Sequence, residues 1–148
     1  MARKQIKLLR KKQPYLDITD REVRNVTLAG LCHDLGHGPF SHVFDGVFIP
    51  GLQRKASNSA EEVNGQPAYW RHEEGSTMMF RDLIESHPAL AEQVSEQDIK
   101  DICSLILGKK SPGDVQRPWL FEIVSNSRNG IDVDKFDYLN RDSQKMKV

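Results

Sequence analysis

Residues 31–42 read Leu-Cys-His-Asp-Leu-Gly-His-Gly-Pro-Phe-Ser-His, and this stretch decides the fold. It contains three of the chain's five histidines, together with Asp34. Imidazole and carboxylate groups are good ligands for divalent metals, and histidine also exchanges protons near neutral pH. The stretch therefore predicts a metal site or a proton-transfer site, and the rest of the chain is expected to support it.

His33 and Asp34 are adjacent, which restricts where they can share a metal ion. Neighbouring residues on an α-helix point about 100° apart, so an ion fits between them most easily at a helix end. The apolar residues before His33 predict such a helix, and Gly36 ends its pattern. A His-Asp pair alone is usually accidental, but the glycines and spaced histidines of the whole string have no evident packing role.

Other helix starts are marked by capping residues. Thr19 and Glu22 form a capping box that predicts a helix over residues 20–35, with His33 and Asp34 at its far end. Ser95, with Asp98 three residues later, predicts another helix, whose apolar residues follow the spacing of a buried face. Helices are also expected over residues 1–12, in the apolar stripe Met78, Met79, Leu83 and Ile84, over 119–124, and from about 132 onward. No stretch predicts a strand, so we expect an all-α bundle of about five helices.

The last expected helix carries two faces. Asp134, Tyr138, Arg141 and Asp142 share one of them, since they are spaced by about one or two turns. Val133 and Phe136 lie on the other face and are expected to point into the core. A polar stripe of this kind is more often solvated than functional.

Length and composition limit the number of domains and the kinds of partner that the chain can have. A chain of 148 residues with 21 basic and 21 acidic residues predicts one domain and no global attraction to nucleic acid. We divide it into a basic segment 1–12, a core 13–142 with a polar mobile loop 51–68, and a tail 143–148. The basic segment is either a solvated helix face or a weak nucleic-acid or nuclear-import segment. Cys32 and Cys103 are expected to be reduced core thiols of an intracellular protein, and no apolar run is long enough to span a membrane.

The longer string over residues 29–42 resembles the HD-domain phosphohydrolases, and it looks most like the SAM- and HD-domain dNTP triphosphohydrolases. The resemblance extends over roughly residues 13–142 and implies a partial, truncated HD-domain helical bundle. It rests on further strings in the same order: Phe44-Asp45-Gly46, Phe48-Ile49-Pro50, Gly75-Ser76-Thr77-Met78-Met79-Phe80, Glu122-Ile123-Val124-Ser125-Asn126 and Arg128-Asn129-Gly130-Ile131-Asp132-Val133-Asp134-Lys135.

The resemblance implies that His33, Asp34 and Asp134 hold a divalent metal ion, which could be zinc, iron, manganese or magnesium. The family's site also uses a histidine from a preceding helix, and residues 1–32 contain no histidine. We therefore expect this chain to bind metal weakly and to turn over dNTPs poorly or not at all. The alternative function is a non-catalytic truncated isoform or fragment that binds nucleotide weakly or associates with a full-length partner.

The resemblance further implies hydrolysis of a dNTP to a deoxynucleoside and triphosphate. His72 would transfer the proton and Asp45 would hold it, although His72 is also consistent with an ordinary first-turn residue. The implied substrate-binding residues are His37 and His42 at the phosphates, Lys135 at the triphosphate charge, and Tyr138 and Asp142 at the sugar. This last group disfavours another HD-domain activity, such as a cyclic-nucleotide phosphodiesterase.

Partners and location follow from the resemblance alone. The family forms homo-oligomers, and it implies a nuclear location, with the cytoplasm as the alternative. Weak binding of single-stranded nucleic acid is a further expectation.

Overall fold

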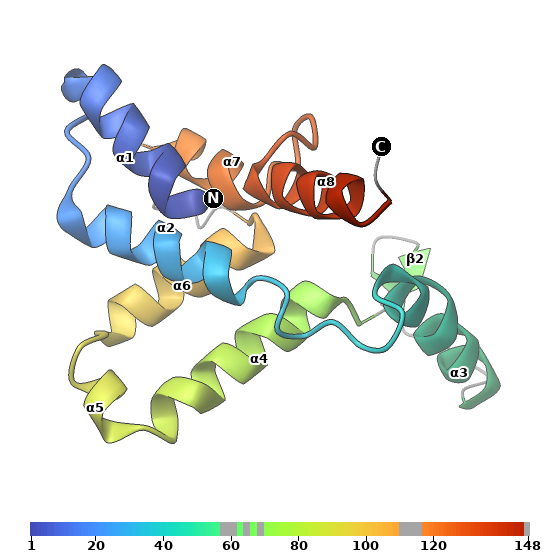
Figure 1. The fold of residues 1–148 in the computed structure, drawn as a ribbon. Helices are drawn as coiled ribbons and strands as arrows, with labels where there is room; N and C mark the ends of the chain where they lie inside the picture. Colours follow the sequence, from blue (N-terminus) through green and yellow to red (C-terminus); the bar gives the residue numbers. More distant parts are fainter. Residues whose placement is uncertain (57–61, 64–65, 68–69, 110–116, 147–148) are drawn as a thin grey trace.

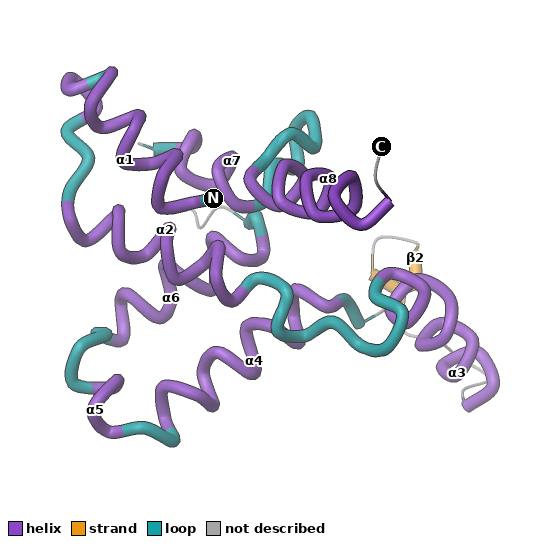
Figure 2. Tube along the Cα trace, viewed as in Figure 1, coloured by secondary structure: helices purple, strands orange, loops and turns teal. Residues whose placement is uncertain are grey.

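The computed structural model describes residues 1–56, 62–63, 66–67, 70–109 and 117–146. These residues are mostly helical, which confirms the all-α fold (Figures 1 and 2). None of their helices is long and apolar enough to cross a membrane. The helices longer than ten residues are α1 (Ala2–Lys12), α2 (Asp20–Cys32), α4 (His72–Glu85), α6 (Glu96–Leu107) and α8 (Val133–Met146).

Shorter elements connect these helices. They are α3 (Ile49–Ala56), α5 (Pro88–Ala91), α7 (Phe121–Val124), the 3-10 turns η1 (Pro14–Leu16) and η4 (Pro118–Leu120), the π-helical turn η2 (Phe44–Phe48), and the antiparallel pair β1 (Glu62–Val63) and β2 (Gln66–Pro67). The predicted loop 51–68 therefore begins as a helix, because α3 continues directly from η2 and contains several good helix formers. The strand pair was not expected either, and the rest of that loop lies outside the described residues.

Helix α2 is the centre of the bundle. It packs against α1, α6, α7 and α4, and Val26 and Ala29 on it are fully buried. The predicted capping box is present, since Thr19 Oγ1 accepts from the Glu22 amide while Glu22 Oε2 accepts from the Thr19 amide at 2.7 Å. The helix ends at Cys32, three residues before the predicted end, because the backbone beyond it forms tighter turns, with bonds from Leu35 to Cys32 and from His37 to Asp34.

The core is one apolar cluster that joins all of these helices. Cys32 and Cys103 belong to it as free thiols, as expected, and burial raises the pKa of both. Ser95 and Asp98 form a second capping box at the start of α6, and Gly108 ends that helix in a left-handed conformation (φ 61°). A Cβ on Gly108 would also lie 2.8 Å from Ser125 Oγ, so glycine is required there.

The predicted core position of Phe136 is wrong. Phe136 is 55% exposed, because α8 packs against α7 near its first turn and then extends away from the bundle (Figure 1). In the predicted apolar stripe of α4, Met78 and Met79 are also exposed, because the buried face of α4 is the one that carries Ser76, Phe80 and Ile84. An apolar pattern does not say which side of a helix its neighbours will cover.

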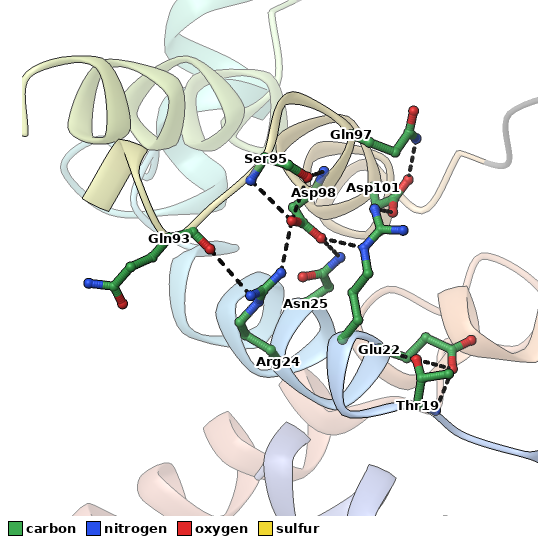
Figure 3. Close-up of polar contacts among 10 residues, drawn as sticks. Thr19, Glu22, Arg24, Asn25, Gln93, Ser95, Gln97, Asp98 and Asp101 are labelled. Carbon is green, nitrogen blue, oxygen red and sulfur yellow. Dashed lines mark hydrogen bonds and ion pairs between the residues drawn. The ribbon is translucent and has the colours of Figure 1, made fainter. Parts of the chain in front are cut away.

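Asp98 ties α6 to α2 through a buried polar network (Figure 3). Its carboxylate lies 2.6 Å from Arg21 Nε and 2.8 Å from Arg24 Nη2, and it accepts from Asn25 Nδ2 at 2.9 Å and from Ser95 Oγ at 2.6 Å. Burial raises the pKa of Asp98, but the hydrogen bonds from Ser95, Arg21 and Asn25 outweigh it and hold that pKa far below the usual range. The network fixes the crossing of the two helices, and α2 carries the candidate site at its end.

Candidate metal and active site

The turn after α2 is pressed against the first turns of α4. A Cβ on Gly36 would lie 2.3 Å from both the carbonyl oxygen of His72 and the amide nitrogen of Ser76. Only glycine fits such an approach of two backbones. Gly36 therefore has a packing role, contrary to our interpretation of the sequence: it brings His33 and Asp34 close to the N-terminus of the helix that carries His72.

His33, Asp34 and Asp134 converge, as expected from the sequence, although about 100 residues separate the last from the first two. His33 Nε2 lies 3.3 Å from Asp34 Oδ1 and 3.1 Å from Asp134 Oδ1. One ligand atom from each residue lies within 4.8 Å of the others. The second ring nitrogen, His33 Nδ1, is 3.1 Å from the carbonyl oxygen of Gly30. Because a carbonyl only accepts, Nδ1 donates to it, and Nε2 is the ring atom that faces the two carboxylates.

Two carboxylates beside one buried imidazole nitrogen make this group attractive to a cation. His33 Nε2 is buried and makes no well-aligned hydrogen bond. Burial lowers the pKa of His33, but Asp134 and Asp34 outweigh it, so the pKa is raised. His33 in turn lowers the pKa of Asp134. One imidazole and two carboxylates in this arrangement fit a divalent metal ion, since such ligands bind zinc-like ions.

A polar loop before α8 delivers Asp134 to the site. Asp132 Oδ1 accepts from the amide of Lys135 at 2.9 Å and caps the helix, while Oδ2 accepts from the amide of Asn126 at 2.9 Å. The Asn126 side chain donates to Asn129 Oδ1 and to the carbonyl of Ile131. The chain turns at Asn129-Gly130, where Gly130 has a left-handed backbone (φ 66°). These bonds set the angle at which α8 leaves the bundle.

Replacing Asp132 with alanine is expected to lower the free energy of unfolding by about 1–2 kcal/mol, because it removes a helix cap and leaves the buried Asn126 amide unpaired. The midpoint of urea unfolding measures this loss. Asp137→Ala is the matched control, because Asp137 is exposed on the same helix and pairs only with Arg141 at 3.4 Å. An equal change in both variants would show that Asp132 has no special role in the loop.

His72 and Asp45 form the second part of the site. His72 Nδ1 lies 2.7 Å from Asp45 Oδ2, and both side chains are largely buried. Burial raises the pKa of Asp45, but the bonds from His72 outweigh it, so the pKa is lowered and the group is a carboxylate. A carboxylate only accepts, so Nδ1 of His72 donates to it and Nε2 is left for another partner.

Two further imidazoles join the two parts. The ring of His37 stacks on that of His72 with centroids 3.8 Å apart, and His42 meets both rings edge-on at 5.0 and 5.3 Å. His37 Nε2 is also 3.5 Å from Asp34 Oδ1. Burial, followed by the charge of His72, lowers the pKa of His37 and favours its neutral form. The histidine cluster and the candidate metal ligands therefore form one continuous site.

The other predicted substrate residues lie along α8. Lys135 follows Asp134 directly, whereas Tyr138 is half-buried and Asp142 is exposed. At a rise of about 1.5 Å per residue, Tyr138 and Asp142 lie about 6 and 12 Å further along the helix than Asp134. Within the described part of the chain, no hydrogen bond or ion pair joins these two side chains to the histidines. Tyr138 and Asp142 therefore lie beyond the candidate metal ligands, toward the exposed end of α8.

Ser76 is the site residue that we did not predict. It lies one turn after His72 on α4 and is fully buried. Its hydroxyl donates to the carbonyl of His33 at 2.5 Å and accepts from the amide of Gly36 at 2.9 Å. The signal was present in the sequence, because a serine on the same helix face as Phe80 and Ile84 is a buried polar group that needs partners.

Comparison with known proteins shows which sequences are similar to this chain. No protein-family model matches the chain. The chain is 47% identical over 150 residues to the deoxynucleoside triphosphate triphosphohydrolase SAMHD1 of Homo sapiens, an alignment that covers 90% of this chain and 22% of the human protein. It is 42% identical over 143 residues to the SAMHD1 homolog of Dictyostelium discoideum, covering 97% of this chain and 24% of that protein.

Over most of its own length, the chain is therefore similar in sequence to the SAMHD1 triphosphohydrolases. It spans between a fifth and a quarter of the length of these relatives. An HD domain-containing protein of Acanthamoeba polyphaga mimivirus is also similar, with 36% identity over 123 residues that cover 83% of this chain and 23% of the viral protein. The similarity to SAMHD1 supports the resemblance drawn from residues 29–42, and the converged site lies inside the aligned segment.

Proposed function

We propose that this chain carries the metal-dependent phosphohydrolase site of a dNTP triphosphohydrolase, which hydrolyses a dNTP to a deoxynucleoside and triphosphate. The observation that carries the proposal is the position of His33 Nε2, buried between Asp34 and Asp134 and next to the histidine cluster. The names of the relatives supply the substrate class, since they are deoxynucleoside triphosphate triphosphohydrolases.

His33, Asp34 and Asp134 would hold the metal ion, which we expect to be zinc, iron, manganese or magnesium. Bound there, it would polarise the α-phosphate and lower the pKa of a water molecule. The three side chains are already placed by Gly30, Gly36 and the loop before α8, so binding needs little rearrangement.

His72 would move the proton. Asp45 accepts from its Nδ1 and fixes the ring, which leaves Nε2 as the atom that exchanges a proton with the reacting groups. A general acid or base must come within hydrogen-bond reach of the atom that it serves. The stacked His37 places His72 beside Asp34 and therefore beside the metal ligands.

The remaining residues would bind the substrate. His37 and His42 would contact the phosphates around the scissile bond, and Lys135 would neutralise triphosphate charge. Tyr138 and Asp142 would meet the deoxyribose, with Asp142 accepting from the 3′-hydroxyl. This order follows α8 outward from Asp134, so the triphosphate would lie at the buried end and the nucleoside at the open end.

The test is triphosphate release from dGTP by purified residues 1–148 with divalent metal and an activating nucleotide. We expect slow, metal-dependent release above the metal-only background, because three ligands hold the metal and the sugar side is open to solvent. The Asp34→Ala variant should return to background. Release that is equal in this variant and in the wild-type chain would contradict the proposed site.

A second candidate function is that of a non-catalytic chain that binds nucleotide weakly or associates with a longer partner. It is favoured by the exposure of Asp142 and of the apolar residues Phe136 and Leu139 on α8, which leaves the sugar side uncovered. No release above background, together with measurable binding of dGTP by equilibrium dialysis, would support it. Homo-oligomer formation, nuclear location and weak binding of single-stranded nucleic acid stay predictions from the sequence.

A further inference from the structure

The hydroxyl of Ser76 bonds to the backbone of the turn that carries His33 and Asp34, the two adjacent candidate metal ligands. In a four-residue turn, the carbonyl of the first residue and the amide of the fourth can bond to each other directly. Here these groups belong to His33 and Gly36, and the hydroxyl of Ser76 lies between them, donating to the carbonyl and accepting from the amide. The neighbouring backbone bonds, Leu35 to Cys32 and His37 to Asp34, are direct.

The inserted hydroxyl explains how the adjacent residues His33 and Asp34 can face the same ion. On a regular helix the two side chains would point about 100° apart. A side chain inserted into the backbone ladder bends the chain at that point. The insertion here falls where α2 ends, and His33 Nε2 and Asp34 Oδ1 reach the same small region, 3.3 Å apart.

We propose that Ser76 is a positioning residue of the metal site, which holds the His33–Gly36 turn open so that His33 and Asp34 face one ion. This inference rests on the proposed function. Ser76 also lies one turn from His72 on the same face of α4, so a single helix face positions the metal ligands and the proton-transferring histidine relative to each other.

The test uses the whole 148-residue chain and two readouts. In the metal-free chain, NMR measures the exchange rate of the Gly36 amide and the ring resonances of His33. In a titration with Mn²⁺, the dissociation constant is measured directly. Ser76→Ala is expected to speed exchange at Gly36, to shift the His33 ring resonances, and to weaken Mn²⁺ binding by about 10–100-fold, as is typical for partners behind metal ligands.

The matched control is Thr77→Val, which removes the hydroxyl of the next residue on α4. That hydroxyl donates to the carbonyl of Glu74 in its own helix and, within the described residues, not to the His33–Gly36 turn, so both readouts should stay at their wild-type values. Ser76→Thr keeps the hydroxyl and adds a buried methyl group, so it should lose stability while it keeps the His33 resonances and the Mn²⁺ affinity. If Ser76→Ala does not fold, the Ser76→Thr variant tests whether the hydroxyl at position 76 positions the turn.

The proposal is overturned if folded Ser76→Ala keeps both the wild-type His33 resonances and the wild-type affinity, or if folded Ser76→Thr loses them. Failure of the proposed function looks different. A wild-type chain that binds no Mn²⁺ would remove the metal site, while the resonances of His33 and the exchange of Gly36 would still show whether Ser76 holds the turn.

Discussion

Replacing His72 with alanine is expected to reduce the rate of triphosphate release from dGTP by about 10²–10⁴-fold, the usual contribution of a positioned acid or base. His72 is the imidazole that a buried carboxylate orients, through the 2.7 Å contact with Asp45. Its removal should leave the metal content unchanged because, among the described residues, no hydrogen bond or ion pair joins its ring to His33, Asp34 or Asp134. Single-turnover assays at high enzyme concentration, together with metal analysis of the same sample, measure both quantities.

The matched control for His72 is His87→Ala. His87 lies just beyond the opposite end of α4 and is exposed, and its ring bonds through Nδ1 to the carbonyl of Leu83. This variant should keep the wild-type rate. A folded His72→Ala chain with a wild-type rate would remove His72 from the mechanism, and a loss of metal in that variant would show that His72 acts on the metal site.

The Asp98→Asn variant is expected to lose about 2–3 kcal/mol of unfolding free energy at pH 7. Breaking a buried ion pair typically costs about 3–5 kcal/mol. The expected value is smaller here because Arg21 and Arg24 remain 48% and 43% exposed and can be rehydrated. The variant removes the charge that both arginines share and part of the capping box of α6 (Figure 3). Urea unfolding measures the loss.

The pH dependence of this loss is a sharper test. The pKa of Asp98 is lowered in the folded chain, so its contribution is fully present above the pKa of an unfolded aspartate, about 3.9, and is lost as the pH falls below that value. The wild-type chain and Asp98→Asn should therefore converge in stability as the pH falls from about 5 to 2. Glu96→Gln, in the exposed first turn of the same helix, should show no such effect. A constant difference between pH 7 and pH 3 would contradict the assigned role.

Local signals in the sequence predicted the helices well. The helix starts at Thr19 and Ser95 were predicted correctly because their capping partners lie three residues away. The convergence of Asp134 on His33 was predicted only through the family resemblance, since no local rule joins residues 100 positions apart. Helix α3 was missed because residues 51–68 as a whole are polar and contain glycine and proline, as loops do, whereas α3 continues directly from the turn η2 before it.

The supporting contacts could not be predicted in this way. Ser76 and Gly36 act through a backbone approach between α2 and α4 that exists only in the folded chain. The same holds for Met78 and Phe136, whose exposure depends on where neighbouring helices stop. Sequence patterns identified which residues carry the chemistry, whereas the residues that hold them in place required the structure.

A titration of residues 1–148 with Mn²⁺ tests the central claim most directly, because the claim is that His33, Asp34 and Asp134 hold one metal ion together. We expect one ion per chain, bound weakly. The Asp134→Asn variant should lose more Mn²⁺ affinity than the roughly 10–100-fold that is typical when a residue that only supports a metal ligand is replaced. Asp137→Asn, on the exposed side of the same helix, should bind as the wild-type chain does. Equal affinity in Asp134→Asn and the wild-type chain, or no binding by the wild-type chain, would contradict the shared site.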